Sequence, residues 1–361
     1  MSQIMGVVVT FVPLILIIFV ANIAQARREK DLPYGGFAAM AYLSMMILYA
    51  GGFLAGLLFQ LGVATLRQQP ELAGQITEAM GGIDLFGMFE SPMLFGAGLW
   101  VSSLIGLVLL LKPVRRFCAR FMPLDPESPV HAIALSWTML VIINLAMTLG
   151  VGLGNMTEMV AATEEMEGAA DVSSMTMITL WTQQILTALL ALVGVGWLTR
   201  LSWQGALTRV GVVRPSMRQA IIGVAFGLAM VPVVVALGAL AAQFNIGVDP
   251  DVDALTEELL GPLFTSAFGI LTLGLAAALG EETIFRGAVQ PRFGILVTAL
   301  LFALLHSNYG ITISTLIVFI LGLMLGYLRM RHNTTTAMIM HAVYNMSLGL
   351  ISLLGMSWMD V

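Results

Sequence analysis

Long apolar runs recur along this chain, and their length is typical of membrane proteins. A bilayer core of roughly 30 Å is crossed by about 20 apolar residues in a helix that rises 1.5 Å per residue. Runs of about this length lie near 5–25, 38–66, 93–111, 131–153, 175–198, 219–242, 262–280, 293–306, 312–330 and 335–355. They predict an all-α polytopic bundle of about ten transmembrane helices.

The composition agrees with a membrane setting. Hydrophobic residues make up 58% of the chain and charged residues 10%, whereas a soluble domain carries about 25% charged residues. Apolar runs of helical length favour a helix bundle over a β-barrel, whose strands are short and alternating. The net charge of −5 gives no reason to expect nucleic acid as a partner. Cys118 is the single cysteine, which excludes an intrachain disulfide and a cysteine zinc cage.

The basic residues predict the orientation of the bundle. If the first run crosses from outside to inside, fifteen of the sixteen Lys and Arg residues fall in inner loops, with Arg67 as the exception. Because basic loops stay in the cytoplasm, both termini are expected outside. Basic residues follow the first run rather than precede it, which predicts an uncleaved span instead of a signal peptide. Together with the low cysteine content, these features lead us to expect a multi-pass protein of a bacterial inner membrane. On the outer side, the acidic stretch 249–258 predicts a short surface helix with Asp253 as its cap.

Charged residues interrupt the apolar pattern at GEETIFRG, residues 280–287, directly after eighteen uncharged residues. Glu282 and Arg286 are spaced i, i+4 with the acid first, which is the favourable order for an ion pair on a helix. Glu281 points about 100° away from Glu282 around the helix. One carboxylate can therefore be held by the arginine while the other stays free. A free carboxylate in a low-dielectric site suits a general base.

Two further polar motifs lie in the last sixty residues. FALLH ends at His306, and HAVYN places His341 and Asn345 on one helix face. An imidazole and an amide directed at one point can bind a water or a metal and donate to an oxyanion. Each motif alone has a plain structural reading, such as a solvated helix end or an interhelical hydrogen bond. Their combination favours function, because ionisable groups inside a membrane are costly.

Glu-Glu-x-x-x-Arg, Phe-x-x-x-His and His-x-x-x-Asn, in this order, resemble the CPBP intramembrane proteases, also called the ABI or type II CAAX prenyl endopeptidase-like family. The motifs cover roughly residues 262–355. The resemblance implies a helical membrane endopeptidase that hydrolyses a peptide bond within the bilayer, at a site opening toward the cytoplasm. By motif position it implies that Glu281 is the acid that activates water and that His306 helps to bind this water. Glu282 and Arg286 would form a supporting ion pair. His341 would be a second water or metal contact, and Asn345 the oxyanion donor.

The sequence leaves several points open. Glu281, His306 and His341 would make a sufficient three-ligand site for zinc or another divalent metal, but a metal requirement is not decided. The expected partners are membrane lipids and a peptide or protein substrate, with or without a lipid group. We divide the chain into residues 1–218, transmembrane helices of unassigned role, and 219–361, the catalytic core. The alternative functions are a membrane transporter and a non-catalytic scaffold or immunity protein of the same fold.

The heights of the predicted site residues depend on where the seventh helix ends. Proline disfavours helix at the preceding residue, which predicts an end just before Pro291. Glu281 would then lie about 14 Å and His306 about 21 Å from that turn. Helix tilt, or an irregular stretch after Arg292 with a bend eased by Gly294, must close the offset of about 7 Å. We expect these groups to meet in one hydrated pocket within the bundle.

Overall fold

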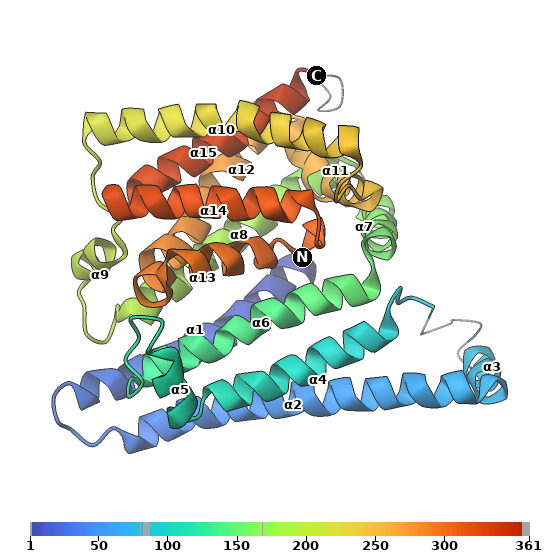
Figure 1. Ribbon diagram of the computed structural model, residues 1–361, viewed down its shortest axis with the longest axis horizontal. Helices are drawn as coiled ribbons and strands as arrows, with labels where there is room; N and C mark the ends of the chain where they lie inside the picture. The colour runs from blue at the N-terminus through green and yellow to red at the C-terminus, as the bar shows by residue number, and fades with distance from the viewer. Residues whose placement is uncertain (1, 80, 82–86, 168, 356–361) are drawn as a thin grey trace.

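The computed structural model describes residues 2–79, 81, 87–167 and 169–355, and long helices make up most of them (Figure 1). The long apolar helical stretches are α1 (Ser2–Arg28), α2 (Gly35–Gln68), α4 (Pro92–Leu109), α6 (Pro129–Val151), α8 (Ala169–Val195), α10 (Met217–Phe244), α14 (Ile313–Arg331), α15 (Thr334–Leu353), and the continuous segment formed by α12 (Ala267–Glu281), the π-helix η1 (Glu282–Val289) and α13 (Gln290–Leu305). Shorter helices connect them: α3 (Pro70–Ala79), α5 (Lys112–Cys118), α7 (Leu153–Glu167), α9 (Trp203–Val210), α11 (Pro250–Phe264) and the 3₁₀ turn η2 (Ser307–Tyr309).

The prediction of an all-α polytopic bundle is confirmed. Within the described residues, nine helical stretches are long and apolar enough to cross a membrane. The sequence predicted about ten, and the difference arises because the seventh and eighth predicted spans are joined in the 39-residue stretch Ala267–Leu305. If straight, that stretch would measure about 58 Å, nearly twice a bilayer core. It is instead broken at Gly294, whose φ of 76° and ψ of 169° are not helical, and α13 packs back against η1.

The predicted helix end before Pro291 is wrong. Gln290 has helical angles, φ −54° and ψ −37°, and its N–H donates to the carbonyl of Phe285, five residues earlier. In a regular α-helix a proline ring clashes with the carbonyl four residues back. The wider π-helical turn before Pro291 relieves that contact, so the helix passes through the proline. The break falls at Gly294, in a backbone region that only glycine adopts readily.

The position of this break sets the height of the site residues. Thirteen residues separate Glu281 from Gly294, and twelve separate Gly294 from His306. At 1.5 Å per residue, the two side chains lie about 20 Å and about 18 Å from the bend. The offset expected from a turn at Pro291 therefore shrinks from about 7 Å to about 2 Å.

The first half of the chain packs directly on the helices that follow it. α2, α4 and α6 pack in series, α6 also contacts α13, and α1 packs on α8. α8 in turn lies against α12 and η1, while α10 and α14 pack on α15 (Figure 1). The close approach of α8 to α12 occurs at Gly280, which faces the backbone of Gln184 and is an example of a small residue at a membrane helix crossing. The division of the chain at residue 218 stays a prediction, but α8 reaches the acids of α12 and η1.

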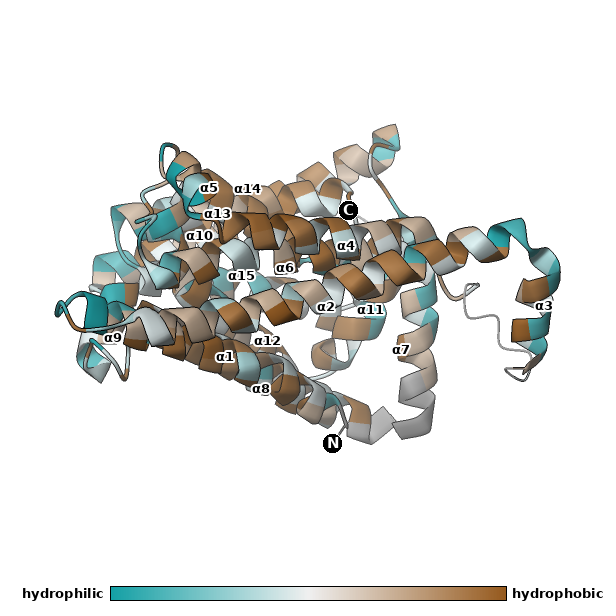
Figure 2. Cartoon of the chain, turned by 90° about the horizontal axis from the view of Figure 1, so that it is seen from below, coloured by the Kyte–Doolittle hydropathy of each residue, from teal (hydrophilic) through white to brown (hydrophobic). Residues whose placement is uncertain are grey.

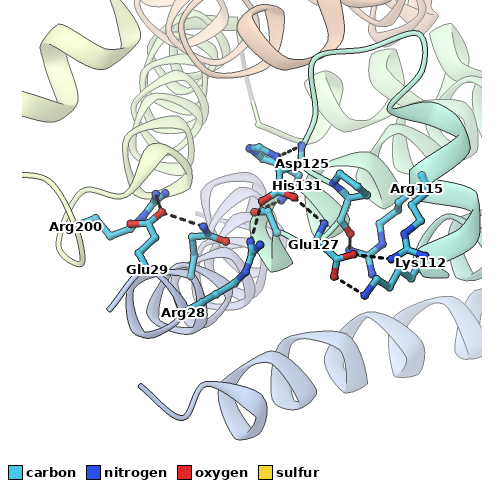
Figure 3. A network of polar contacts seen from close by, with 12 residues as sticks. Arg28, Glu29, Lys112, Arg115, Asp125, Glu127, His131 and Arg200 are labelled. Carbon is cyan, nitrogen blue, oxygen red and sulfur yellow. Dashed lines mark hydrogen bonds and ion pairs between the residues drawn. The ribbon is translucent and has the colours of Figure 1, made fainter. Parts of the chain in front are cut away.

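One end of the bundle, which contains α5, α9 and their loops, is hydrophilic (Figure 2). Basic residues lie there, among them Lys112, Arg115 and Arg116 of α5. Ion pairs fasten the loops there to one another (Figure 3). Their nitrogen–oxygen distances are 2.8 Å for Arg28–Asp125, 2.5 Å for Lys112–Glu127 and 2.8 Å for Arg200–Glu29. This end is the one that the basic residues predict to face the cytoplasm.

The predicted surface helix in the acidic stretch 249–258 is present as α11, but its cap differs. The side chain of Asp249 accepts a hydrogen bond from the N–H of Asp251 at 3.0 Å, and Pro250 occupies the first helical position. The prediction of Asp253 as the cap is wrong. Proline is favoured at the first position of a helix, which moves the start four residues earlier.

Candidate active site

Both acids of GEETIFRG lie where an α-helix changes into a π-helix. Glu281 is the last residue of α12 and Glu282 is the first residue of η1. Single π turns inside α-helices are rare and are found frequently at functional sites. Here the π turn lies within a bundle of otherwise regular helices, at the one segment where charges interrupt the apolar pattern.

Glu282 and Arg286 form a completely buried ion pair. Both side chains are 0% exposed, and Arg286 Nε lies 3.2 Å from Glu282 Oε2. The other oxygen of Glu282 contacts His341 Nδ1 of α15 at 2.9 Å. The guanidinium carbon of Arg286 lies 4.4 Å from the centre of the Phe302 ring, in a cation–π arrangement. The i, i+4 pairing expected from the sequence is thus present, and His341 extends it to a second helix.

Glu281 points away from this pair, toward α8 and the end of α13. Its Oε1 accepts a hydrogen bond of 3.1 Å from Gln184 Nε2. Its Oε2 lies 4.0 Å from His306 Nε2, and the two side chains keep 16% and 25% of their surface exposed. The acid that the sequence left free is therefore the more accessible one, and it faces a histidine.

The backbone fixes the orientation of the His306 ring. His306 follows the last residue of α13, and its Nδ1 lies 2.8 Å from the carbonyl oxygen of Phe302. A carbonyl only accepts, so Nδ1 carries a proton and Nε2 is the ring nitrogen that faces Glu281. Phe302 packs edge-on against the ring and Tyr309 stacks on it, with centroid distances of 4.8 and 6.0 Å.

Asn345 lies on α15 one turn after His341 and is partly buried. In the described part of the chain, it forms no side-chain hydrogen bond to another residue. The structure therefore brings five of the six predicted site residues into two contacting groups, Glu281 with His306 and Glu282 with Arg286 and His341. Asn345 lies near these groups only because it follows His341 by one turn on the same face of α15.

The sequence reasoning missed Gln184. Its signal was a pair of glutamines, Gln183 and Gln184, inside the apolar run 175–198. Polar side chains at such positions commonly hydrogen-bond to another helix. What the pattern could not supply was the partner, an acid 97 residues further along the chain.

Several buried polar atoms of the site have no hydrogen-bond partner among the described residues. They include Glu281 Oε2, Gln184 Oε1 and both terminal nitrogens of Arg286. Buried polar atoms are satisfied in the great majority of native structures, so this site is equipped to bind a polar ligand or water.

A catalytic zinc ion would need three protein ligands directed at one point. Within the described residues, no three His, Cys, Asp or Glu side chains are grouped so that they could hold a metal. His341 Nδ1 is directed to Glu282 instead of joining Glu281 and His306. The set Glu281, His306 and His341 therefore does not fit a three-ligand zinc site in this arrangement, and the question of a metal requirement, which the sequence left open, stays open.

One of the comparisons with known proteins covers the residues of this site. No curated protein and no solved structure matches the chain. Residues 263–347 match the family model described as type II CAAX prenyl endopeptidase Rce1-like. The matched range contains all three polar motifs, which lie at the junction of α12 and η1, at the end of α13 and on α15. It confirms the resemblance drawn from the motifs: residues 263–347 are similar to the Rce1-like type II CAAX prenyl endopeptidases.

Proposed function

We propose that the chain is an intramembrane endopeptidase in which Glu281 and His306 activate a water molecule. The observation that supports this most directly is the 4.0 Å separation of Glu281 Oε2 and His306 Nε2. In the proposed state His306 carries its one ring proton on Nδ1, so both atoms accept, and a water donating to two acceptors at about 2.8 Å joins atoms about 4 to 4.6 Å apart. The pair is thus spaced for one shared water.

The proposed reaction uses this water as the nucleophile. Glu281 takes one proton, the water oxygen bonds to the carbonyl carbon of the substrate, and the carbonyl electrons move to its oxygen. His306 Nε2 accepts the second O–H and orients the attack. As the carbon–nitrogen bond breaks, the proton held by Glu281 passes to the leaving amine. Asn345 is assigned to donate to the oxyanion, a role in which a single donor contributes a large part of the rate.

The buried group of Glu282, Arg286 and His341 is assigned a supporting role. Phe302 connects it to the first pair, since its ring contacts His306, His341 and Arg286 at centroid or carbon distances of 4.8, 6.1 and 4.4 Å. The hydrogen bond from His341 to Glu282 joins α15 to η1, and the buried pair with Arg286 holds the Glu282 carboxylate in place. The acid and the histidines then keep their places without reorganisation during the reaction.

The proposed substrate is a peptide or protein segment at the membrane, with or without a lipid group, reached from the cytoplasmic side of a bacterial inner membrane. The description of the matched family as a prenyl endopeptidase supports a lipidated peptide. The basic residues of α5 and of the neighbouring loops support a cytoplasmic location for the hydrophilic end of the bundle.

Cleavage by purified protein tests the proposal. The full chain in detergent is incubated with a library of C-terminally prenylated and unmodified peptides, and the products are read by mass spectrometry. We expect Glu281→Gln and His306→Phe to reduce cleavage by about 10² to 10⁴-fold, the range of general-base catalysis. Glu257→Gln, at an exposed acid of α11, is the matched control and should cleave like wild type.

Two outcomes separate the remaining possibilities. Full activity of a folded Glu281→Gln variant would remove that residue from the mechanism. Solute uptake into proteoliposomes without any cleavage would favour the transporter alternative. A chelator arm addresses the metal: cleavage that is lost on chelation and restored by zinc would assign a metal to the site.

A further inference from the structure

We propose that Gln184 of α8 is a positioning residue that fixes the Glu281 carboxylate for its reaction. The inference rests on the proposed function and extends it. It assigns a role in the site to a helix outside residues 263–347, the range that matches the family.

The hydrogen bond between Gln184 and Glu281 gives the two carboxylate oxygens of Glu281 different partners. Gln184 Nε2 donates to Glu281 Oε1 at 3.1 Å, while Glu281 Oε2 lies 4.0 Å from His306 Nε2. A carboxylate that turns about its last bond exchanges its two oxygens. Holding Oε1 opposes that rotation, so Oε2 stays directed at the histidine and at the water between them.

The position of the Gln184 amide is set by the backbones of two helices. At Gly280, a Cβ atom would lie 2.9 Å from Gln184 Cα and 2.7 Å from Gln184 O, so glycine is needed for the close approach. One turn earlier, Trp181 Nε1 donates to Thr272 Oγ1 at 3.3 Å. α8 and α12 are therefore joined beside the acid at Gly280 and again at Thr272, nine residues before Glu281. Gln184 is 4% exposed and has little freedom to move away.

A hydrogen bond that merely joins α8 to α12 would have different consequences. Its loss would lower the stability and leave the chemical step unchanged. A positioning bond acts on the chemical step, because misplacing a catalytic group by a small distance is costly in rate. Turnover, substrate affinity and stability, measured separately, distinguish the two roles.

The test compares Gln184→Met with Gln183→Met in the full chain. Methionine keeps the length and the unbranched shape of glutamine and removes the amide. Gln183 is the neighbouring residue and is exposed, so it controls for the same substitution on the same helix. We expect a loss of about 10- to 100-fold in kcat for Gln184→Met, the size expected for a hydrogen bond to a charged group. KM should stay near the wild-type value, and Gln183→Met should resemble wild type in kcat, KM and melting temperature.

Gln184→Glu serves as a second variant should Gln184→Met fail to fold. It keeps the shape but replaces the donor with a second carboxylate, so its kcat should fall at least as far. A kcat within twofold of wild type for either folded variant overturns the inference, as does an equal loss in Gln183→Met. A wild-type protein that cleaves no peptide overturns the proposed function and this inference together. Cleavage by wild type with unchanged Gln184 variants overturns the inference alone.

Discussion

Replacing Arg286 with methionine should destabilise the protein strongly, because it removes one partner of a completely buried ion pair. Arg286 and Glu282 are both 0% exposed, with 3.2 Å between Nε and Oε2. At an effective dielectric constant of about 20, two unit charges at that distance attract by about 5 kcal/mol. Most of this attraction offsets the cost of taking both charges out of water. Removing one partner leaves the other buried and uncompensated, which costs about 3–5 kcal/mol.

The surroundings place the expected loss in the lower part of that range. His341 Nδ1 still donates to Glu282 at 2.9 Å, and methionine keeps a contact with the Phe302 ring that now lies 4.4 Å from the guanidinium carbon. We expect about 3 kcal/mol of destabilisation for Arg286→Met. The double variant Glu282→Gln with Arg286→Met removes both charges and should recover much of that loss.

Denaturant unfolding of the purified variants in one detergent, followed by tryptophan fluorescence, measures these differences. Arg218→Met, at an exposed arginine, is the control and should change the free energy of unfolding by less than about 0.5 kcal/mol. The reasoning is refuted if Arg286→Met is as stable as this control. It is also refuted if the double variant is less stable than Arg286→Met, since the penalty would then not arise from an unpaired buried carboxylate.

Three further predictions follow from particular positions. Gly294→Ala should cost about 1–3 kcal/mol of stability. The cause would be backbone strain alone, because a Cβ atom there meets no atom within 4 Å. Gly62→Ala, equally uncrowded but in a helix, should be neutral or stabilising in the same melting assay. Burial opposes ionisation of Asp125, but hydrogen bonds from Arg28 and from the Glu127 N–H outweigh it and lower the pKa of Asp125 from its ordinary 3.8. A lowered pKa gives stability that is fully present above 3.8 and is lost as the pH falls through the lowered pKa of the folded state. The difference in melting temperature between wild type and Asp125→Asn at pH 6 should therefore shrink as the pH falls below 3.8; parallel pH profiles would contradict this. Asn345→Ala should lower kcat by about 10² to 10³-fold with KM unchanged, as for the loss of an oxyanion donor, and a change in KM alone in steady-state cleavage would rule out that role.

The local patterns of the sequence were enough for the membrane class and for part of the site. Apolar length depends only on the residues of a segment, so the spans could be read without knowing their neighbours. The Glu282–Arg286 pair was predictable for the same reason, since four residues of one helix place both side chains on one face. The prediction at Pro291 failed because a rule for regular α-helix was applied to a segment that is a π-helix.

The contacts that join the site across helices could not be read from such patterns. His341 meets Glu282 across 59 residues of chain, and Gln184 meets Glu281 across 97. Which of two adjacent glutamines faces an acid, and which faces lipid, depends on how α8 is rotated and how closely it crosses α12 at Gly280.

The sequence by itself determined that this chain crosses a membrane many times and carries three polar motifs in order near its end. Only the tertiary structure decided that Glu281 faces His306 while Glu282 is held by Arg286 and His341, and that Gln184 of α8 hydrogen-bonds to Glu281. The physical reason is that an apolar run and a spacing of four residues are properties of one helix. The partner of a buried polar atom is instead chosen by the packing of several helices together.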